Sequence, residues 1–363
     1  MREPVADGTA ARKLEPAATA RRSGEANFDR LLVARIPKVQ LHCHLEGTVS
    51  AGTFRDLAAL RGVVSARANG PLEGTYVFAT FGEFLLTFAE VCKTLQCPAD
   101  YARVATEYAK DAAAQNVRYA ELFISPSVWK FFHPELDVVA CVKAMREALT
   151  VAERQRGPIV RFICDLTRNF GTERAFQTAR LAVQLAESDG GVIGIGLGGD
   201  EANFPAALYA EPFSFARAHG LHTVAHAGEA AGAQSVRDAV MILGAERIGH
   251  GVRALEDDRV VDMLARRGIA LECAPTSNAR TGIVDAQAVH PLVALDERGV
   301  VVTVDADDPA LFGTSITREL ELVGETVGTH DMVRFVRNAV DASFAEPTRK
   351  SALQLELDAA LES

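Results

Sequence analysis

Positions 39–44 read Val39-Gln40-Leu41-His42-Cys43-His44, a short apolar run that ends in a pair of histidines. Apolar residues alternating with a polar one over a few positions indicate a β-strand, which we place at Val39–His42. Because alternate side chains of a strand face the same side, His42 and His44 are expected to point into one place. The stretch therefore predicts a strand whose C-terminal end carries two imidazoles, side chains that zinc commonly takes as ligands.

Short apolar runs continue to alternate with longer amphipathic segments along the rest of the chain. The further strands are expected at Val117–Ile124, Ile159–Asp165, Val192–Leu197, His222–His226, Arg247–Gly249, Ile269–Cys273 and Val300–Val304. Helical periodicity is clearest at Val138–Arg156, Glu173–Glu187, Ser235–Leu243 and Asp257–Arg267. Eight strands alternating with helices predict an α/β fold of the (β/α)8 TIM-barrel type. An open, doubly wound parallel sheet is the alternative architecture.

A long segment separates the first two predicted strands, about 74 residues, which is far more than one crossover helix needs. We expect a helical insertion there. Within it, Phe81, Phe84 and Phe88 have i, i+3, i+7 spacing and share one helix face, as core packing or as an apolar wall or lid over a pocket. Residues 1–27 are expected to form a disordered tail. Residues 28–363 are expected to form a single barrel domain with a helical C-terminal extension.

The composition excludes some classes of protein. The 363 residues include 38 Lys+Arg and 48 Asp+Glu, a net charge of −10, which excludes a strongly basic nucleic-acid binder. No apolar run reaches the length of about 18 residues that a membrane-spanning helix needs. The six cysteines show no C-x-x-C spacing and are expected to be reduced, packed thiols of a cytoplasmic protein.

Polar side chains also follow three of the later predicted strands. They lie in His226-Ala227-Gly228-Glu229, in Gly249-His250-Gly251 and in Asp305-Ala306-Asp307-Asp308-Pro309. Since the C-terminal ends of barrel strands meet at one mouth, four of the nine histidines and an acidic cluster are predicted to converge there. The other five histidines are expected at the surface or at helix ends: His133, His219, His222, His290 and His330.

This set of residues predicts metal-assisted hydrolysis. His42, His44 and His226 supply three nitrogens, and the Asp307 carboxylate can complete the shell while accepting a hydrogen bond from a water molecule. One Zn²⁺ per subunit is expected, with iron, cobalt or manganese as alternatives. His250 is then available to stabilise or deprotonate the water, and Glu229 to act as general acid.

Six motifs in order between Ile36 and Leu320 carry a family resemblance. They are His42-Cys43-His44-Leu45-Glu46-Gly47, Leu197-Gly198-Gly199-Asp200-Glu201, His226-Ala227-Gly228-Glu229, Arg247-Ile248-Gly249-His250-Gly251, Pro275-Thr276-Ser277-Asn278 and Asp307-Asp308-Pro309. This set resembles the adenosine deaminase family of the amidohydrolase superfamily. The H-x-E and P-C-x-x-C signature of the other zinc deaminase class is absent from the sequence.

The resemblance implies roles for particular residues. His42, His44, His226 and Asp307 would be the zinc ligands. Glu229 would protonate purine N1, and His250 would orient and activate the water, with Asp307 assisting. Asp308 would meet N7, and the backbone N–H of Gly199 would meet N3. The implied reaction converts adenosine or 2′-deoxyadenosine to inosine or 2′-deoxyinosine with release of ammonia.

Three departures from the family pattern bear on the substrate. Glu46 stands where adenosine deaminases usually have the Asp that contacts the ribose, and Phe123 stands where they often have Arg. Both resemble the adenine deaminases of the family. Asp305 replaces the usual Asn and would either alter nearby pKa values or be solvated.

Other functions therefore remain open beside adenosine deamination. They are adenine deamination, deamination of a modified adenosine such as aminodeoxyfutalosine and, remotely, nucleoside binding by a catalytically silent barrel. The expected partner is a small purine, with neither nucleic acid nor membrane. The sequence does not indicate an oligomeric state.

Overall fold

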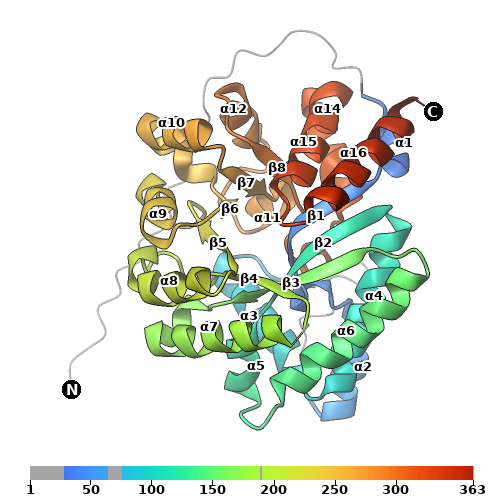
Figure 1. Cartoon of the computed structure of the whole chain (residues 1–363), viewed down its shortest axis with the longest axis vertical. Coiled ribbons are helices and arrows are strands. Elements are labelled where there is room, and N and C mark those ends of the chain that lie inside the picture. Colours follow the sequence, from blue (N-terminus) through green and yellow to red (C-terminus); the bar gives the residue numbers. More distant parts are fainter. Residues whose placement is uncertain (1–27, 64–75, 189, 363) are drawn as a thin grey trace.

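Eight parallel strands form the centre of the molecule in a computed structural model, which describes residues 28–63, 76–188 and 190–362. The strands follow one another around the sheet in chain order, with helices outside them (Figure 1). Their bounds are β1 Lys38–His44, β2 Val117–Ile124, β3 Ile159–Asp165, β4 Val192–Gly196, β5 His222–Ala227, β6 Arg247–His250, β7 Ala270–Cys273 and β8 Val302–Val304. The predicted (β/α)8 barrel is confirmed. The predicted tail, residues 1–27, lies outside the described residues.

The helices occur mostly where the periodicity predicts them. Those after β2 are α5 Pro126–Phe132, α6 Val138–Arg154, α7 Gly171–Glu187, α8 Ala210–Ala218, α9 Ala233–Asp238, α10 Asp258–Arg267, α11 Pro275–Arg280, α12 Leu292–Glu297, α13 Pro309–Phe312 and α14 Ile316–Val327. The predicted helix Ser235–Leu243 is wrong in detail, because its second half, Ala239–Leu243, is a π-helix. Gly244 ends it at a positive φ of 69°.

The two ends of the described chain are also helical. The short helix α1 Arg30–Arg35 precedes β1, and α15 Thr329–Ala342 and α16 Pro347–Glu362 follow α14 as the predicted C-terminal extension. Helix α15 packs against β8 and β1. No helix among the described residues has the length and apolar character needed to cross a membrane.

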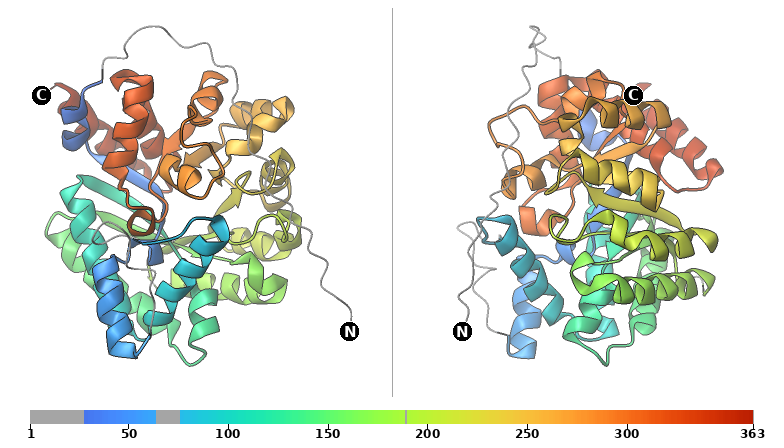
Figure 2. Two further views of the ribbon diagram at one scale, coloured as in Figure 1. Left: turned by 180° about the vertical axis from the view of Figure 1, so that it is seen from behind. Right: turned by 90° about the vertical axis from the view of Figure 1, so that its left-hand side faces the viewer.

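The predicted insertion between β1 and β2 is helical in the part that the structure describes. It contains α2 Ala51–Arg61, α3 Phe81–Thr94 and α4 Pro98–Ala114, which Figure 2 shows in blue to green along one side of the barrel. Phe81, Phe84 and Phe88 lie on one face of α3, with ring centroids 6.0 and 6.4 Å apart. Phe84 also stacks on Phe312 of α13 at 4.8 Å. Helix α3 is thereby fixed beside the end of β8.

The barrel closes between β8 and β1 through a few polar contacts. Beyond β8, Asp307 forms an isolated parallel bridge with Cys43. The Asp305 carboxylate accepts hydrogen bonds from the backbone N–H groups of Leu41 and His42, at 2.7 and 3.0 Å. Of the two alternatives for Asp305, the solvated carboxylate is wrong, because its side chain is buried in this seam and satisfies backbone donors that a regular ladder would pair. Burial raises the pKa of Asp305 to about 6.

Candidate active site

A pocket of about 260 Å³ opens at the C-terminal ends of the strands. Its chemistry-bearing wall comes from strand ends and the loops after them: His44, Asp165, Gly198, Gly199, His226, Glu229, His250, Asp307 and Asp308. Its opposite wall is apolar and comes from α3, α5 and the turn before α7: Phe81, Phe84, Leu85, Phe88, Ala89, Val128, Phe131, Phe132 and Phe170. A flat, polar-edged ring such as a purine matches this division between polar and apolar walls.

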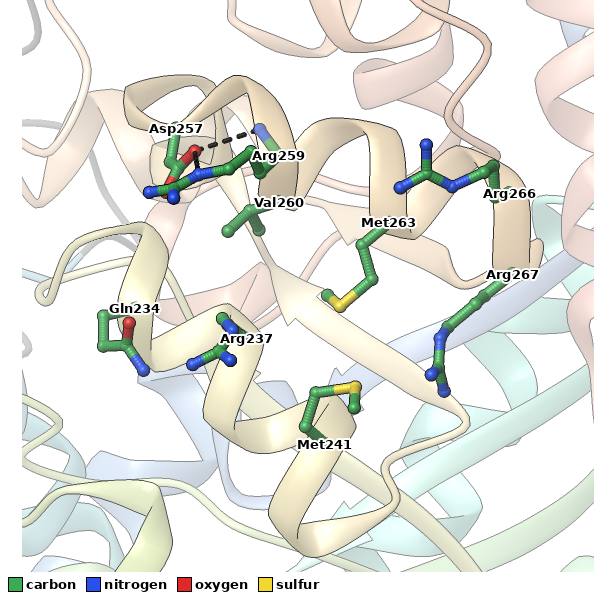
Figure 3. A pocket seen from close by; sticks show the side chains of 9 residues that line it. All are labelled: Gln234, Arg237, Met241, Asp257, Arg259, Val260, Met263, Arg266 and Arg267. Atoms are coloured by element: carbon green, nitrogen blue, oxygen red, sulfur yellow. Dashed lines mark hydrogen bonds and ion pairs between the residues drawn. The ribbon is translucent and has the colours of Figure 1, made fainter.

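A larger hollow of about 620 Å³ lies elsewhere, between α9 and α10 (Figure 3). Its described lining includes Arg237, Arg259, Arg266 and Arg267, and its single carboxylate, Asp257, pairs with Arg259 at 2.9 Å. The four arginines are exposed, and no histidine is among those lining residues. The acid–base groups are therefore at the barrel mouth and not in this hollow.

The predicted metal ligands meet at the bottom of the pocket. His44 Nε2 lies 3.2 Å from His226 Nε2, and Asp307 Oδ1 lies 3.5 Å from Nε2 of both His42 and His44. Zinc–nitrogen bonds of about 2.05 Å in a tetrahedral arrangement space neighbouring ligand atoms by about 3.3 Å. The buried Nε2 of His42 has no hydrogen-bond partner among the residues that the structure describes. The donor types, their spacing and this unpartnered atom fit a divalent ion of zinc's size.

Burial keeps two of these rings in the form that binds metal. It lowers the pKa of His44 to about 3 and that of His226 well below its ordinary value. On the other side of the cluster, His42 Nδ1 lies 2.7 Å from Glu272 Oε2. A carboxylate in that position holds the Nδ1 proton and turns Nε2 toward the ion.

Glu272 belongs to a charged network inside the barrel. The Arg247 side chain donates from Nε to Glu272 and from Nη2 to Glu121, both at 2.6 Å, and its guanidinium lies 3.7 Å from the Phe344 ring centroid. All three charged side chains are buried. Sequence reasoning missed them, although a charge inside a predicted apolar strand is itself a signal, since buried charges need partners.

Glu229 is placed for proton transfer. Burial, with Asp307 and Glu201 nearby, raises the pKa of Glu229 well above its ordinary value, which favours the protonated carboxyl. Its Oε2 lies 3.6 Å from His250 Nε2, and Asp307 Oδ2 lies 3.9 Å from the same nitrogen. His250 and Asp307 both have positive φ, 61° and 59°, a strained backbone that directs their side chains into the pocket.

The residues expected at the purine edge also lie in this wall. Gly199 has a φ of 93°, and a Cβ there would lie 2.4 Å from Asn169 Oδ1. Among the described residues its N–H has no hydrogen-bond partner. The buried Oδ1 of Asp308 is also unpartnered. Gly47 makes room for that carboxylate, because a Cβ at position 47 would overlap it at 1.9 Å.

Glu46 and Phe123 do not line the pocket. The buried Glu46 carboxylate accepts hydrogen bonds from Ser125 N–H at 2.9 Å and from Trp129 Nε1–H at 2.6 Å. Burial raises the pKa of Glu46 to about 7. Phe123 lies behind the ligands, with its ring stacked on His44 at 5.0 Å. In this structure both residues support the site from behind its surface.

Two further side chains of the site were not predicted. Asp165, the last residue of β3, lines the pocket with a buried, unpartnered Oδ1, and burial raises its pKa to about 6. Its place at a strand end was the available signal. His290 was assigned to the surface or a helix end, and it does lie just before α12, but its link to the site was not predicted. It is partly buried and hydrogen-bonds Asn278 at 3.0 Å, and Asn278 contacts His250 at 3.2 Å.

Comparison with known proteins places this geometry in a family. The family model described as Adenosine deaminase matches residues 37–360. The chain belongs to the adenosine deaminase family. The adenine deaminase of Rhodospirillum rubrum is 34% identical over 334 residues, which cover 91% of this chain and 98% of that protein. The aminodeoxyfutalosine deaminase of Streptomyces coelicolor is 34% identical over 366 residues, 96% of this chain and 94% of that one.

A solved structure agrees with the fold and contains a bound metal. An amidohydrolase from Burkhoderia ambifaria with bound Zn superposes with a TM-score of 0.81 and 28% identity, over 94% of this chain and 97% of that one. As a member of the adenosine deaminase family, the protein is a hydrolase acting on C–N bonds. Its histidine and aspartate cluster supports a metal cofactor.

Proposed function

We propose that the protein hydrolyses the 6-amino group of a purine, with free adenine as the substrate that its site fits best. The observation that carries the choice of adenine is the placement of Glu46. Its carboxylate, the group expected to contact a sugar, does not line the pocket, and its Oε1 accepts hydrogen bonds from Ser125 and Trp129 behind the pocket wall. The names of relatives at 34% identity favour adenine or a modified nucleoside over adenosine.

One Zn²⁺ per subunit would be held by His42, His44, His226 and Asp307, whose atoms have the spacing described above. A zinc ion bound there lowers the pKa of a water molecule to about 7 and so supplies a nucleophile at neutral pH.

The side chains around the cluster would divide the proton chemistry between them. Glu229, protonated through burial, donates to purine N1 while water adds to C6. The protonated Asp308 carboxyl donates to N7, because burial and the charge of Asp307 raise its pKa well above the ordinary value. Gly199 N–H donates to N3. The two protons of the water molecule balance the step: one passes to the amino group, which leaves as ammonia, and the other restores the proton of Glu229, so adenine and water become hypoxanthine and ammonia.

The apolar wall favours a second candidate, deamination of a modified adenosine such as aminodeoxyfutalosine. The rings of Phe81, Phe84 and Phe88 extend the pocket away from the polar wall and would cover a substituent on the purine. The relative named for this activity aligns with this chain over 94% of its length. Adenosine, which would place a bare ribose against these rings, fits less well.

Ammonia release by the zinc-loaded full chain tests the proposal. We would supply adenine, adenosine, 2′-deoxyadenosine, N6-methyl-AMP and aminodeoxyfutalosine at equal concentration and compare kcat/KM. Adenine is expected to be the preferred substrate. Preference for aminodeoxyfutalosine would select the second candidate, and no release from any of the five by a zinc-replete protein would refute purine deamination as proposed. Glu229→Gln provides the inactive control.

A further inference from the structure

Two side chains, Asn278 and His290, form a hydrogen-bonded line behind His250, on the side away from the pocket. Nδ1 of His250 lies 3.2 Å from Nδ2 of Asn278, a fully buried residue on α11. Oδ1 of Asn278 lies 3.0 Å from Nε2 of His290, which precedes α12. The line ends at the backbone of α12, where Leu292 N–H donates to Nδ1 of His290 at 3.1 Å.

The backbone N–H at the end of this line determines the direction of every hydrogen bond in it. Because Leu292 N–H can only donate, Nδ1 of His290 must be a bare acceptor, and the proton of the neutral ring is on Nε2. Burial lowers the pKa of His290 to about 3, in keeping with a neutral ring. His290 Nε2–H then donates to Asn278 Oδ1, which turns the amide NH₂ of Asn278 toward His250. Nδ1 of His250 must therefore accept.

We infer that Asn278 and His290 are positioning residues that hold His250 in the tautomer with its proton on Nε2, so that His250 faces the reacting centre as a hydrogen-bond donor. The assignment of the tautomer rests on this chain of contacts alone. Its consequence for chemistry rests on the proposed function.

The tautomer determines how His250 can take part in deamination. Its Nε2 is the nitrogen that faces Glu229 and Asp307, at 3.6 and 3.9 Å. A neutral ring that already carries a proton there cannot take one from water at that nitrogen. It can donate a hydrogen bond to the oxygen that becomes negative as water attacks. The proton that water loses then passes to a carboxylate, and Asp307 Oδ2, 3.9 Å from this nitrogen, is a carboxylate oxygen placed to take it.

A matched pair of substitutions at His290 separates this role from a merely structural one. In His290→Gln, the side-chain amide can still donate to Asn278 Oδ1 and accept from Leu292 N–H, so the direction of the line is kept. In His290→Glu, a carboxylate of the same length accepts from both neighbours. The Asn278 amide must then turn over, present Oδ1 to His250 and draw the ring proton to Nδ1.

The tautomer is measured by long-range ¹H–¹⁵N correlation on the zinc-loaded full chain with ¹⁵N-labelled histidine. The two neutral tautomers give different patterns, and the spectrum of His250→Gln identifies the signals of His250. Steady-state ammonia release gives kcat and KM for the best substrate of the panel above. Metal content and melting temperature are recorded for each variant. Asn278→Asp, which also leaves only acceptors facing Nδ1, replaces His290→Glu if that variant does not fold.

The expected result is the Nε2–H tautomer in the wild type and in His290→Gln, which keeps most of kcat. The Nδ1–H tautomer is expected in His290→Glu, with kcat reduced about 100-fold and KM changed less than threefold, because only an interaction of the reacting state is lost. An Nδ1–H wild type, or a tautomer change without loss of kcat, overturns the inference. The spectra need no turnover, so failure of the inference is distinguishable from failure of the proposed function.

Discussion

Replacing Glu201 by glutamine is predicted to disorder the loop that carries Glu229. The buried Glu201 carboxylate follows β4 and accepts four hydrogen bonds from successive backbone N–H groups after β5. The donors are Gly228 at 2.6 Å, Glu229 at 3.1 Å, Ala230 at 2.8 Å and Ala231 at 2.9 Å. Gly228, with a φ of 72°, begins the turn that the carboxylate closes. One side chain thus fixes the backbone of the proposed acid.

The size of the effect follows from these four contacts. Glu201→Gln keeps the shape but removes the charge and turns one oxygen into a donor. In the variant, the amide oxygen can take the place of Oε2 and still accept from Glu229, Ala230 and Ala231. The hydrogen bond from Gly228 is then lost, which costs about 2 kcal/mol. The other three hydrogen bonds no longer involve a charge, which costs about 0.5–1 kcal/mol each. The sum is about 4 kcal/mol. With an unfolding entropy of about 2.1 cal/mol/K per residue over the described chain, the melting temperature falls by about 6 °C.

Calorimetry and ammonia release at 25 °C measure the two consequences. We expect kcat to fall about 100-fold as well, because a displacement of Glu229 of about 1 Å has an effect of that order. Asp200→Asn is the matched control, since this neighbouring carboxylate bonds only to Asn203, at 3.1 and 2.8 Å, among the described residues. The reasoning is refuted if the melting temperature of Glu201→Gln lies within 1 °C of that of this control. It is also refuted if the melting temperature falls as expected but kcat stays at the wild-type value.

Further outcomes follow from the same geometry. Glu229→Gln is expected to lower kcat at least 100-fold with zinc content unchanged, because a carboxyl proton is lost from the pocket. Retained activity in a sample with the same zinc content as the wild type would contradict the role of Glu229 as acid. Asp165→Asn is expected to raise KM about tenfold with little change in melting temperature, since one pocket-facing acceptor is lost, and an unchanged KM for every substrate would exclude contact. A chelator is expected to abolish ammonia release and lower the melting temperature, with zinc restoring both; activity that survives metal removal, checked by elemental analysis, would exclude the metal mechanism. Lys38 has a pKa lowered to about 8, because burial outweighs the charge of Glu321. Between pH 8 and 10 Lys38 is protonated in the unfolded protein but largely neutral in the folded protein. The unfolding free energy should therefore rise with pH relative to that of Lys38→Met, by at most about 3 kcal/mol. Parallel pH profiles of the two proteins would refute this.

The fold and the metal cluster could be predicted because their signals are local in the sequence. A short apolar run predicts each strand, and the position directly after the run is expected at the mouth of the barrel. His42, His44, His226 and Asp307 occupy such positions, and the structure brings them together. Asp165 has the same signal in the sequence, because it is the last residue of the predicted strand Ile159–Asp165.

The supporting residues could not be predicted in the same way, because their partners are distant in sequence. Arg247 joins Glu121 and Glu272, which are 126 and 25 positions away, and a one-dimensional pattern does not pair them. Asn278 belongs to the motif Pro275-Thr276-Ser277-Asn278, but its contact with His290 depends on the conformation of the loop before α12. The role of Glu46 was similarly decided by Trp129, 83 positions on.

The different behaviour of two buried glutamates shows what this supporting layer achieves. Burial alone raises the pKa of both Glu229 and Glu272. At Glu272 the charge of Arg247 reverses the effect and lowers the pKa, so this carboxylate is a permanent anion that orients His42. At Glu229 the neighbours Asp307 and Glu201 add to the effect of burial and raise the pKa further, which favours the protonated carboxyl. Two identical side chains thus become a structural anion and a proton donor, because one has a guanidinium beside it and the other has carboxylates.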